Sequence, residues 1–125
     1  MAQIAIHNAS DIPWYQGPHE IPGIRFRHAR QTLGVSAFGM NVLDIEAGCT
    51  GYPQHDHTHD GQEEVYVVLS GSAVLHAGEQ EHPLREGDFV RVPADVQRTF
   101  TTSTGVTLLA LGGTPGAAYV AGAGM

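Results

Sequence analysis

The sequence predicts an all-β fold in a single domain, and three observations lead to this prediction. The 16 glycines and 7 prolines are scattered over 125 residues, and the segments between them are short and rich in Val, Ile, Leu, Thr and Phe. That pattern is typical of many short strands joined by turns. No window shows a sustained 3.6-residue apolar period with caps, so we expect any helix to be minor. A chain of this length can build one hydrophobic core.

Charge and hydropathy argue against several classes of function. Thirteen acidic residues against six basic ones give a net charge of −7, and the basic residues form no cluster. Nucleic acid and anionic membranes are therefore not expected partners. The N-terminus has no basic start or long apolar run, and no window approaches a membrane span, so we expect a cytoplasmic protein. The single cysteine, Cys49, cannot form an intrachain disulfide or a CxxC motif.

Residues 1–23 are expected to form an N-terminal arm or strand. The arm contains an extended piece over Ile4–His7 and a proline-punctuated loop around Trp14. We expect Trp14 to anchor the arm by packing in the core or an interface, because a large aromatic ring buries much apolar surface. Lining of a ligand pocket by Trp14 is the alternative.

The rest of the chain is expected to alternate between short strands and turns. Alternating or β-branched apolar residues mark each strand, and Gly, Pro, Asp or Asn marks each turn. The expected strands are Ile24–His28, Ser36–Glu46, Glu64–Leu69, Ser72–His76, Glu81–Leu84, Phe89–Val92, Arg98–Thr102 and Val106–Leu111. Residues 112–116 break the regular structure, and residues 117–125 are expected to form a weakly packed C-terminal tail.

The stretch from 51 to 71 carries most of the functional information. His55, His57 and His59 lie at alternate positions, so in an extended segment all three imidazoles share one face. A few residues later, Glu64 and Tyr66 share one face of a β-forming segment. Imidazoles and a carboxylate delivered from two neighbouring strands are a sound ligand set for a divalent first-row metal. We therefore predict a metal site that draws on these three histidines and Glu64.

The same stretch resembles the first conserved motif of the cupin superfamily, Gly-x5-His-x-His-x(3,4)-Glu-x6-Gly. Gly51, His57, His59, Glu64 and Gly71 match it at every position. The resemblance implies a cupin jelly-roll β-barrel, also called a double-stranded β-helix, which we expect over residues 24–116. It also implies a bound transition metal such as Fe, Mn, Ni, Cu or Zn, and a small-molecule ligand in the barrel. Small cupins resemble each other in pairing as homodimers, so we expect one here, with the N-terminal arm at the interface.

The second cupin motif, Gly-x5-Pro-x-Gly-x2-His, is matched only in part. Gly87 and Pro93 are present, but Asp95 stands at the glycine and Arg98 at the histidine that supplies the family's fourth metal ligand. An arginine directed inward would repel a cation, whereas it could bind an anionic ligand's carboxylate bidentately. Arg98 could also point outward as a solvated charge.

The ligand pair is open on the basis of spacing. Counting forward from the Ala47-Gly48 turn indicates His55 and His57, and counting back from the glycine at 71 indicates His57 and His59. All three have the same parity, so a shift of two residues keeps them on one face. Glu64 is favoured over its neighbour at 63 by the six-residue gap to that glycine.

Two functional hypotheses follow. The first is a metal-binding small cupin, with an oxygenase or isomerase type of activity on a small molecule; no catalytic residue is assigned. The second is a non-catalytic cupin that binds a small anion, such as a carboxylate or sugar acid, without metal. Gln62, Tyr66 and Arg98 are the expected ligand-binding residues, since Gln62 shares the parity of Glu64.

Overall fold

The computed structural model describes residues 3–121. Seven strands account for most of the regular structure, together with one short 3₁₀ helix and one short α-helix. The elements are η1 (Ala9–Asp11), β1 (Ile24–Arg27), α1 (Ala29–Leu33), β2 (Gly39–Ile45), β3 (Glu63–Ala77), β4 (Gln80–Arg85), β5 (Phe89–Val92), β6 (Arg98–Thr101) and β7 (Val106–Gly113). Neither helix is long and apolar enough to cross a membrane.

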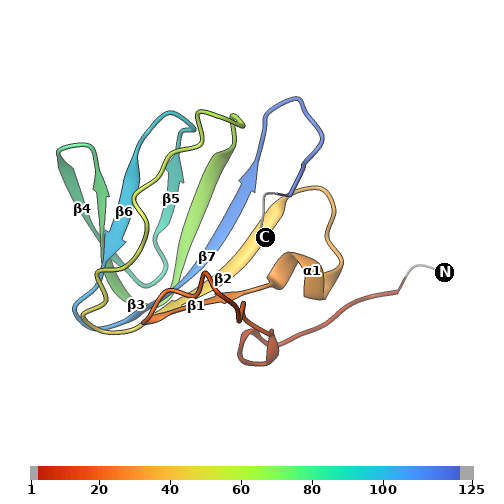
Figure 1. The fold of residues 1–125 in the computed structure, drawn as a ribbon, viewed down its shortest axis with the longest axis horizontal. Coiled ribbons are helices and arrows are strands. Elements are labelled where there is room, and N and C mark those ends of the chain that lie inside the picture. Colours follow the sequence, from red (N-terminus) through yellow and green to blue (C-terminus); the bar gives the residue numbers. More distant parts are fainter. Residues whose placement is uncertain (1–2, 122–125) are drawn as a thin grey trace.

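The strands form two facing antiparallel layers (Figure 1). The first layer has the order β1, β2, β7, first half of β3, β5, and the second places the other half of β3 between β4 and β6. This arrangement is the jelly-roll barrel that the sequence predicts. Each of the eight expected strand segments overlaps a strand of the structure, and two of them merge into the 15-residue strand β3. The expected segment Ser36–Glu46 is longer than β2 at both ends.

Strand β3 belongs to both layers because it bends at Gly71. Residues 63–71 pair with β7, and residues 72–77 pair with β4 and β6. Gly71 has a φ of +79°, in the region that favours glycine. The bend brings the two ends of β3 to the same open end of the barrel. Ala77 at one end pairs with Arg98, whose side chain reaches Glu64 at the other.

The core fills the space between the layers. Most apolar residues that point inward are buried, as the alternation of apolar and polar residues along a strand leads one to expect, while Phe26 and Val90 are partly buried at its edge. Leu43, Tyr66, Leu75, Phe100 and Leu108 are each no more than 3% exposed. The rings of Tyr66 and Phe100 meet edge to face, with their centroids 4.8 Å apart.

The N-terminal arm lies against the outer face of the first layer, where a second apolar cluster forms. Ile12 is 4% exposed and packs there with Ala29 of α1 and Val42 of β2. Trp14, expected to anchor the arm, is only half-buried: its ring is stacked by Arg25, with the guanidinium carbon 4.7 Å from the ring centroid. Ile12 therefore supplies the buried apolar contact, and Trp14 covers the arginines of β1.

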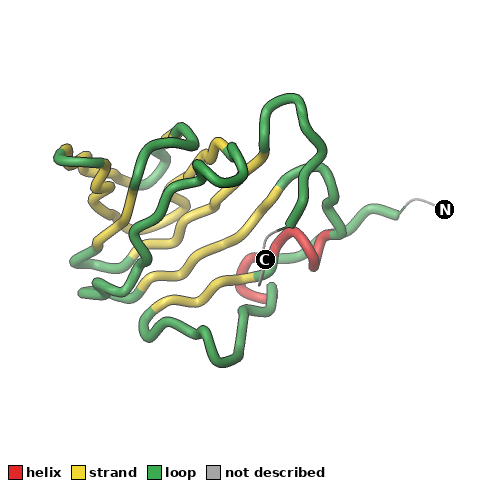
Figure 2. Tube along the Cα trace, turned by 45° about the horizontal axis from the view of Figure 1, so that its top comes forward, coloured by secondary structure: helices red, strands yellow, loops and turns green. Residues whose placement is uncertain are grey.

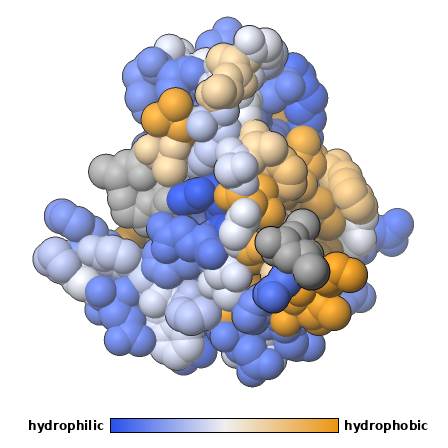
Figure 3. Space-filling view, turned by 90° about the vertical axis from the view of Figure 1, so that its right-hand side faces the viewer, coloured by the Kyte–Doolittle hydropathy of each residue, from blue (hydrophilic) through white to orange (hydrophobic). Residues whose placement is uncertain are grey.

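Two local features differ from the expectations. Ile4–His7 is not a strand, and Ile4 remains 90% exposed. An α-helix forms over Ala29–Leu33, which the sequence does not predict because five residues are too few to show a helical period. Both short helices lie to one side of the sheet (Figure 2). Figure 3 shows the face that lies at the right in Figure 1. Hydrophobic residues gather on one part of this face and hydrophilic residues on another.

The bend at Gly71 leads to a stability prediction. A Cβ on this residue would lie 2.1 Å from the carbonyl oxygen of Gly105, and the positive φ adds strain. Gly71→Ala should therefore lower the free energy of unfolding by about 2 kcal/mol or more, measured by urea denaturation. Gly113→Ala is the matched control, since a Cβ there meets nothing within 4 Å. Equal stabilities for the two variants would contradict a strained bend.

Candidate metal centre

Three side chains meet at the open end of the barrel. The Oε1 atom of Glu64 lies 3.1 Å from Nε2 of His57 and 3.7 Å from Nε2 of His55. Glu64 is 8% exposed, whereas the side chain of His55 is 33% exposed and connects the site to solvent. One potential ligand atom from each residue lies within 4.8 Å of the others. The three residues can therefore contact one ion together.

Backbone pairing sets the direction of both imidazoles. His55 forms an antiparallel bridge with Arg98, with N to O distances of 3.1 and 2.9 Å, and the N–H of His57 donates to the carbonyl of Ala94 at 2.8 Å. The segment is thus extended beside β6, and the period of two sends both rings to the same side. Glu64 faces them from β3.

Hydrogen bonds to the other ring nitrogens determine which atoms are free to bind a metal. Nδ1 of His55 lies 3.0 Å from the carbonyl oxygen of Pro53, which can only accept, so this nitrogen carries the proton. Nδ1 of His57 lies 3.1 Å from a carboxylate oxygen of Asp60 and donates to it. Burial raises the pKa of Asp60, but hydrogen bonds from Gln62 and His57 outweigh burial and lower it. Both Nε2 lone pairs therefore point at Glu64, the arrangement that outer hydrogen bonds give metal-binding histidines.

This geometry favours a positive charge between the rings and the carboxylate. Two lone pairs that face a carboxylate repel it unless a proton or a metal ion lies between them. The contact with Glu64 raises the pKa of His55. Burial raises the pKa of Glu64, yet contacts with His55 and Tyr66 and the charges of His57 and Arg98 outweigh burial and lower it. Two imidazoles and a carboxylate fit a divalent first-row metal by their chemistry.

Arg98 points into the barrel and is completely buried, which decides between the alternatives for this residue. Its Nη2 donates to Oε1 of Glu64 at 3.0 Å, and its Nη1 donates to the carbonyl of Val96 at 2.8 Å. Its Nε is a buried donor without a hydrogen-bond partner among residues 3–121. A permanent cation thus shares the carboxylate that two imidazoles face.

Two buried tyrosines, Tyr66 and Tyr52, contact residues of the site. Tyr66, 1% exposed, donates its hydroxyl to Oε1 of Glu64 at 2.6 Å. Burial raises the pKa of Tyr66 and also that of Tyr52, whose ring packs on Phe100 and lies beside His55. Both phenols therefore stay protonated at neutral pH, and Tyr66 holds the carboxylate as a hydrogen-bond donor.

The remaining expected site residues are His59 and Gln62. The side chain of His59 is 74% exposed, and its Nε2 lies 3.3 Å from Asp60 rather than from Glu64. With His57 and Asp60 it forms a second, more exposed group that could hold an ion. Gln62 is half-buried beside Gly112. Sequence reasoning missed Tyr52 and Asp60; the turn sequence after His59 was the only signal for Asp60.

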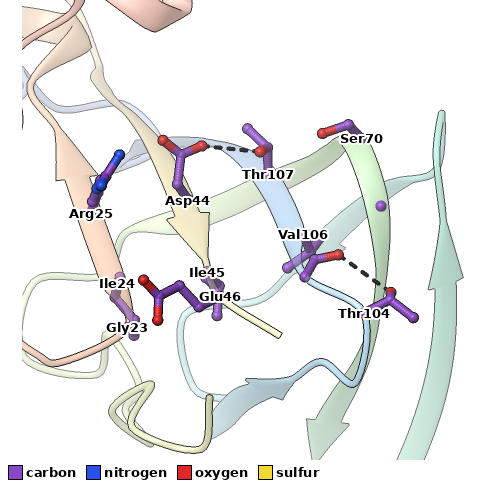
Figure 4. A pocket seen from close by; sticks show the side chains of 12 residues that line it. Gly23, Ile24, Arg25, Asp44, Ile45, Glu46, Ser70, Thr104, Val106 and Thr107 are labelled. Carbon is purple, nitrogen blue, oxygen red and sulfur yellow. Dashed lines mark hydrogen bonds between the residues drawn. The ribbon is translucent and has the colours of Figure 1, made fainter. Parts of the chain in front are cut away.

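A separate groove lies at the opposite end of the barrel, beside the bend of β3 (Figure 4). It has a volume of about 560 Å³, and Arg25, Asp44 and Thr107 contribute polar groups to its wall. Asp44 already accepts hydrogen bonds from Arg27 at 2.6 Å and from Thr107 at 3.0 Å. Asp44 and Thr107 of this wall thus bond to each other, and none of the histidines of the candidate metal centre lines the groove.

A two-layered β-barrel with two histidines and a glutamate directed inward at its open end is the architecture of a cupin. Residues 41–111 match the profile of the Cupin domain family, which is more than half of the chain. The chain therefore belongs to this family, and the resemblance seen in the sequence is confirmed. No protein with curated information matches the chain.

Solved structures show the same fold. A sugar phosphate isomerase from a cupin superfamily of Silicibacter pomeroyi has a TM-score of 0.69 and 23% identity, covering 84% of this chain and 73% of its own. A predicted oxalate decarboxylase from Thermotoga maritima has a TM-score of 0.68 and 18% identity, covering 86% and 96%. A cupin protein from Bacteroides fragilis has a TM-score of 0.64 and 17% identity, covering 90% and 92%. At these identities the similarity concerns the fold.

The pKa shifts of Glu64 and His55 predict how the stability of the metal-free protein varies with pH. The lowered pKa of Glu64 stabilises the fold above the ordinary value of 4.5, and this contribution is lost as the pH falls through the lowered value. The raised pKa of His55 stabilises the fold below the ordinary value of 6.5, and this contribution is lost as the pH rises through the raised value. With chelator present, both contributions are complete between these two values.

Urea denaturation from pH 3 to pH 8 measures this profile. His55→Gln should remove part of the decline on the alkaline side, because the imidazole titrates there. It should also weaken the acid-side contribution, since the contact with His55 helps to lower the pKa of Glu64. His59→Gln is the control, since its side chain is mostly exposed. An unchanged alkaline slope in His55→Gln would show that the pair with Glu64 does not form.

Proposed function

We propose that this protein is a metal-dependent small cupin that binds one divalent first-row metal through His55, His57 and Glu64 and acts on a small molecule at the open end of the barrel. The observation that carries the proposal is the convergence of two Nε2 atoms on one buried carboxylate oxygen, at 3.1 and 3.7 Å. Cupin membership and the metal-ligand chemistry of the three side chains support it.

The chemistry would be of the oxygenase or isomerase type. A metal held by three protein ligands keeps positions open, and when bound it would polarise a substrate oxygen or activate dioxygen. The chain's own residues would prepare this site. Pro53 and Asp60 orient the two rings through their Nδ1 atoms, and Tyr66 fixes the rotation of the Glu64 carboxylate through its hydroxyl.

Metal content tests the proposal and the choice of ligand pair. After incubation with Mn²⁺ or Zn²⁺ and desalting, elemental analysis should find about one metal ion per chain in the wild type. His55→Ala and His57→Ala should each lose most of it, because each removes a ligand. His59→Ala should retain it, since that imidazole is mostly exposed and does not face Glu64.

Two outcomes would count against this. Loss of metal in His59→Ala with retention in His55→Ala would move the site to the group formed by His57, His59 and Asp60. A wild type that takes up no metal would remove the proposed function itself.

A second candidate is a cupin that binds a small anion without metal, and the charge of Arg98 favours it. Arg98 is a permanent cation beside Glu64, and its positive charge would attract a carboxylate or sugar acid to the open end of the barrel. Among solved structures of the same fold, one is described as a sugar phosphate isomerase and one as a predicted oxalate decarboxylase. Sugar phosphates and oxalate, the compounds in these two names, are anions.

Thermal denaturation separates the two candidates. If the anion alone is bound, small carboxylates should raise the melting temperature in the presence of EDTA, by an amount equivalent to about 2.7 kcal/mol at a hundred times Kd. The shift should disappear in Arg98→Met. A shift that vanishes with EDTA in the wild type would instead assign the anion to the metal-bound protein.

A further inference from the structure

His55, His57, Glu64, Asp60 and Arg98 form a polar cluster at the open end of the barrel. One member, Arg98, brings a positive charge that is not needed to hold a metal. Arg98 is always protonated and lies 3.0 Å from the Glu64 carboxylate. Glu64 and Asp60 supply the negative charges in contact with the two imidazoles, which are neutral as ligands. Asp56 also attracts Arg98, but it contacts neither imidazole and accepts hydrogen bonds from Thr58 near the surface, where water screens its charge. With both imidazoles neutral, as metal ligands are, the side chains of the cluster therefore sum to one net negative charge.

The positive charge cannot leave when a metal arrives. Arg98 is 0% exposed, its backbone is paired with His55, and its guanidinium also donates to the carbonyl of Val96 at 2.8 Å. A long side chain at the surface would swing into water, but this one is enclosed on all sides. A divalent ion bound to Glu64 thus leaves the cluster with one excess positive charge in a mostly buried place.

An uncompensated charge in such a place is unfavourable, because a low dielectric strengthens repulsion and water cannot solvate the charge. A small anion on the open side of the metal would restore neutrality. We propose that metal binding at this site is coupled to binding of a small monoanion, with a carboxylate as the chemical class that fits. The inference rests on the proposed metal site, and it names the class of molecule on which that site acts.

A carboxylate fits for two reasons. It supplies one negative charge, which is the excess that Arg98 creates, and its oxygens are suitable ligands for the open positions of a divalent metal. By linkage, the anion must tighten metal binding by the same factor by which the metal tightens anion binding. Each partner therefore binds less tightly alone than together with the other, so the site favours an anionic ligand presented with the metal.

Titration of Mn²⁺ in HEPES buffer, with free Mn²⁺ measured by electron paramagnetic resonance, tests the coupling. Sodium acetate is compared with sodium perchlorate at equal ionic strength, because perchlorate is a poor ligand. In the wild type, acetate should tighten the Mn²⁺ dissociation constant about tenfold or more. Acetate also binds Mn²⁺ weakly in solution, which would act in the opposite direction, so a tightening must come from the protein.

Two variants at the same position isolate the charge. Arg98→Met keeps a long apolar stem and removes the charge, so it should bind Mn²⁺ about tenfold more tightly in perchlorate and respond little to acetate. Arg98→Lys keeps the charge and should keep the acetate effect. If Arg98→Met does not fold, the comparison of acetate with perchlorate in the wild type still decides the question.

The outcomes distinguish this inference from the metal site itself. Tight Mn²⁺ binding in perchlorate that acetate does not change overturns the coupling and leaves the metal site intact. Binding in Arg98→Met alone, with none in the wild type in either salt, also overturns the coupling, because the anion then fails to relieve the repulsion. Absence of binding in all three proteins overturns the metal site and the coupling together.

Discussion

The bend of β3 at Gly71 is the constraint on which the rest of the structure depends. One strand pairs with β7 before the bend and with β4 and β6 after it, so a single chain segment connects both layers of the barrel. The bend is possible because glycine can adopt the φ of +79° found at Gly71. Glycine also has no side chain, and a Cβ at this position would collide with the carbonyl of Gly105. As a consequence, Glu64 at one end of β3 lies close to β6, which pairs with Ala77 at the other end of β3. Both lie at the open end of the barrel.

The carboxylate of Glu64 is where the interactions of that end converge. Its Oε1 accepts from Tyr66 and Arg98 and faces the two imidazoles, so one oxygen lies at the centre of four groups from three segments of the chain. Removing one member of a buried ion pair leaves the other charge unpaired, which costs about 3–5 kcal/mol. Arg98 is thus a structural partner of Glu64 as well as a source of charge beside the metal ligands, and stability and ligand choice depend on the same contact.

Much of the fold could be read from the sequence, because alternation of apolar residues and the placement of Gly and Pro are local properties. The eight expected strand segments each overlap a strand, whereas the helix over Ala29–Leu33 is too short to show a period. The burial of Ile12 in place of Trp14 could not be seen, since it depends on the outer face of a sheet whose order is not written in any one segment.

The sequence by itself determined the family, the approximate strands and the set of candidate ligands, since motif spacing and residue chemistry are local. It left open whether His55 or His59 joins His57, because both have the same parity along an extended segment. The tertiary structure decided the geometry: the bridge between His55 and Arg98 sets the register of the loop beside β6, and His59 falls beyond it and stays exposed. The inward direction of Arg98 was likewise a tertiary outcome, because a buried guanidinium requires Glu64 as its partner, and that partner is 34 residues away along the chain.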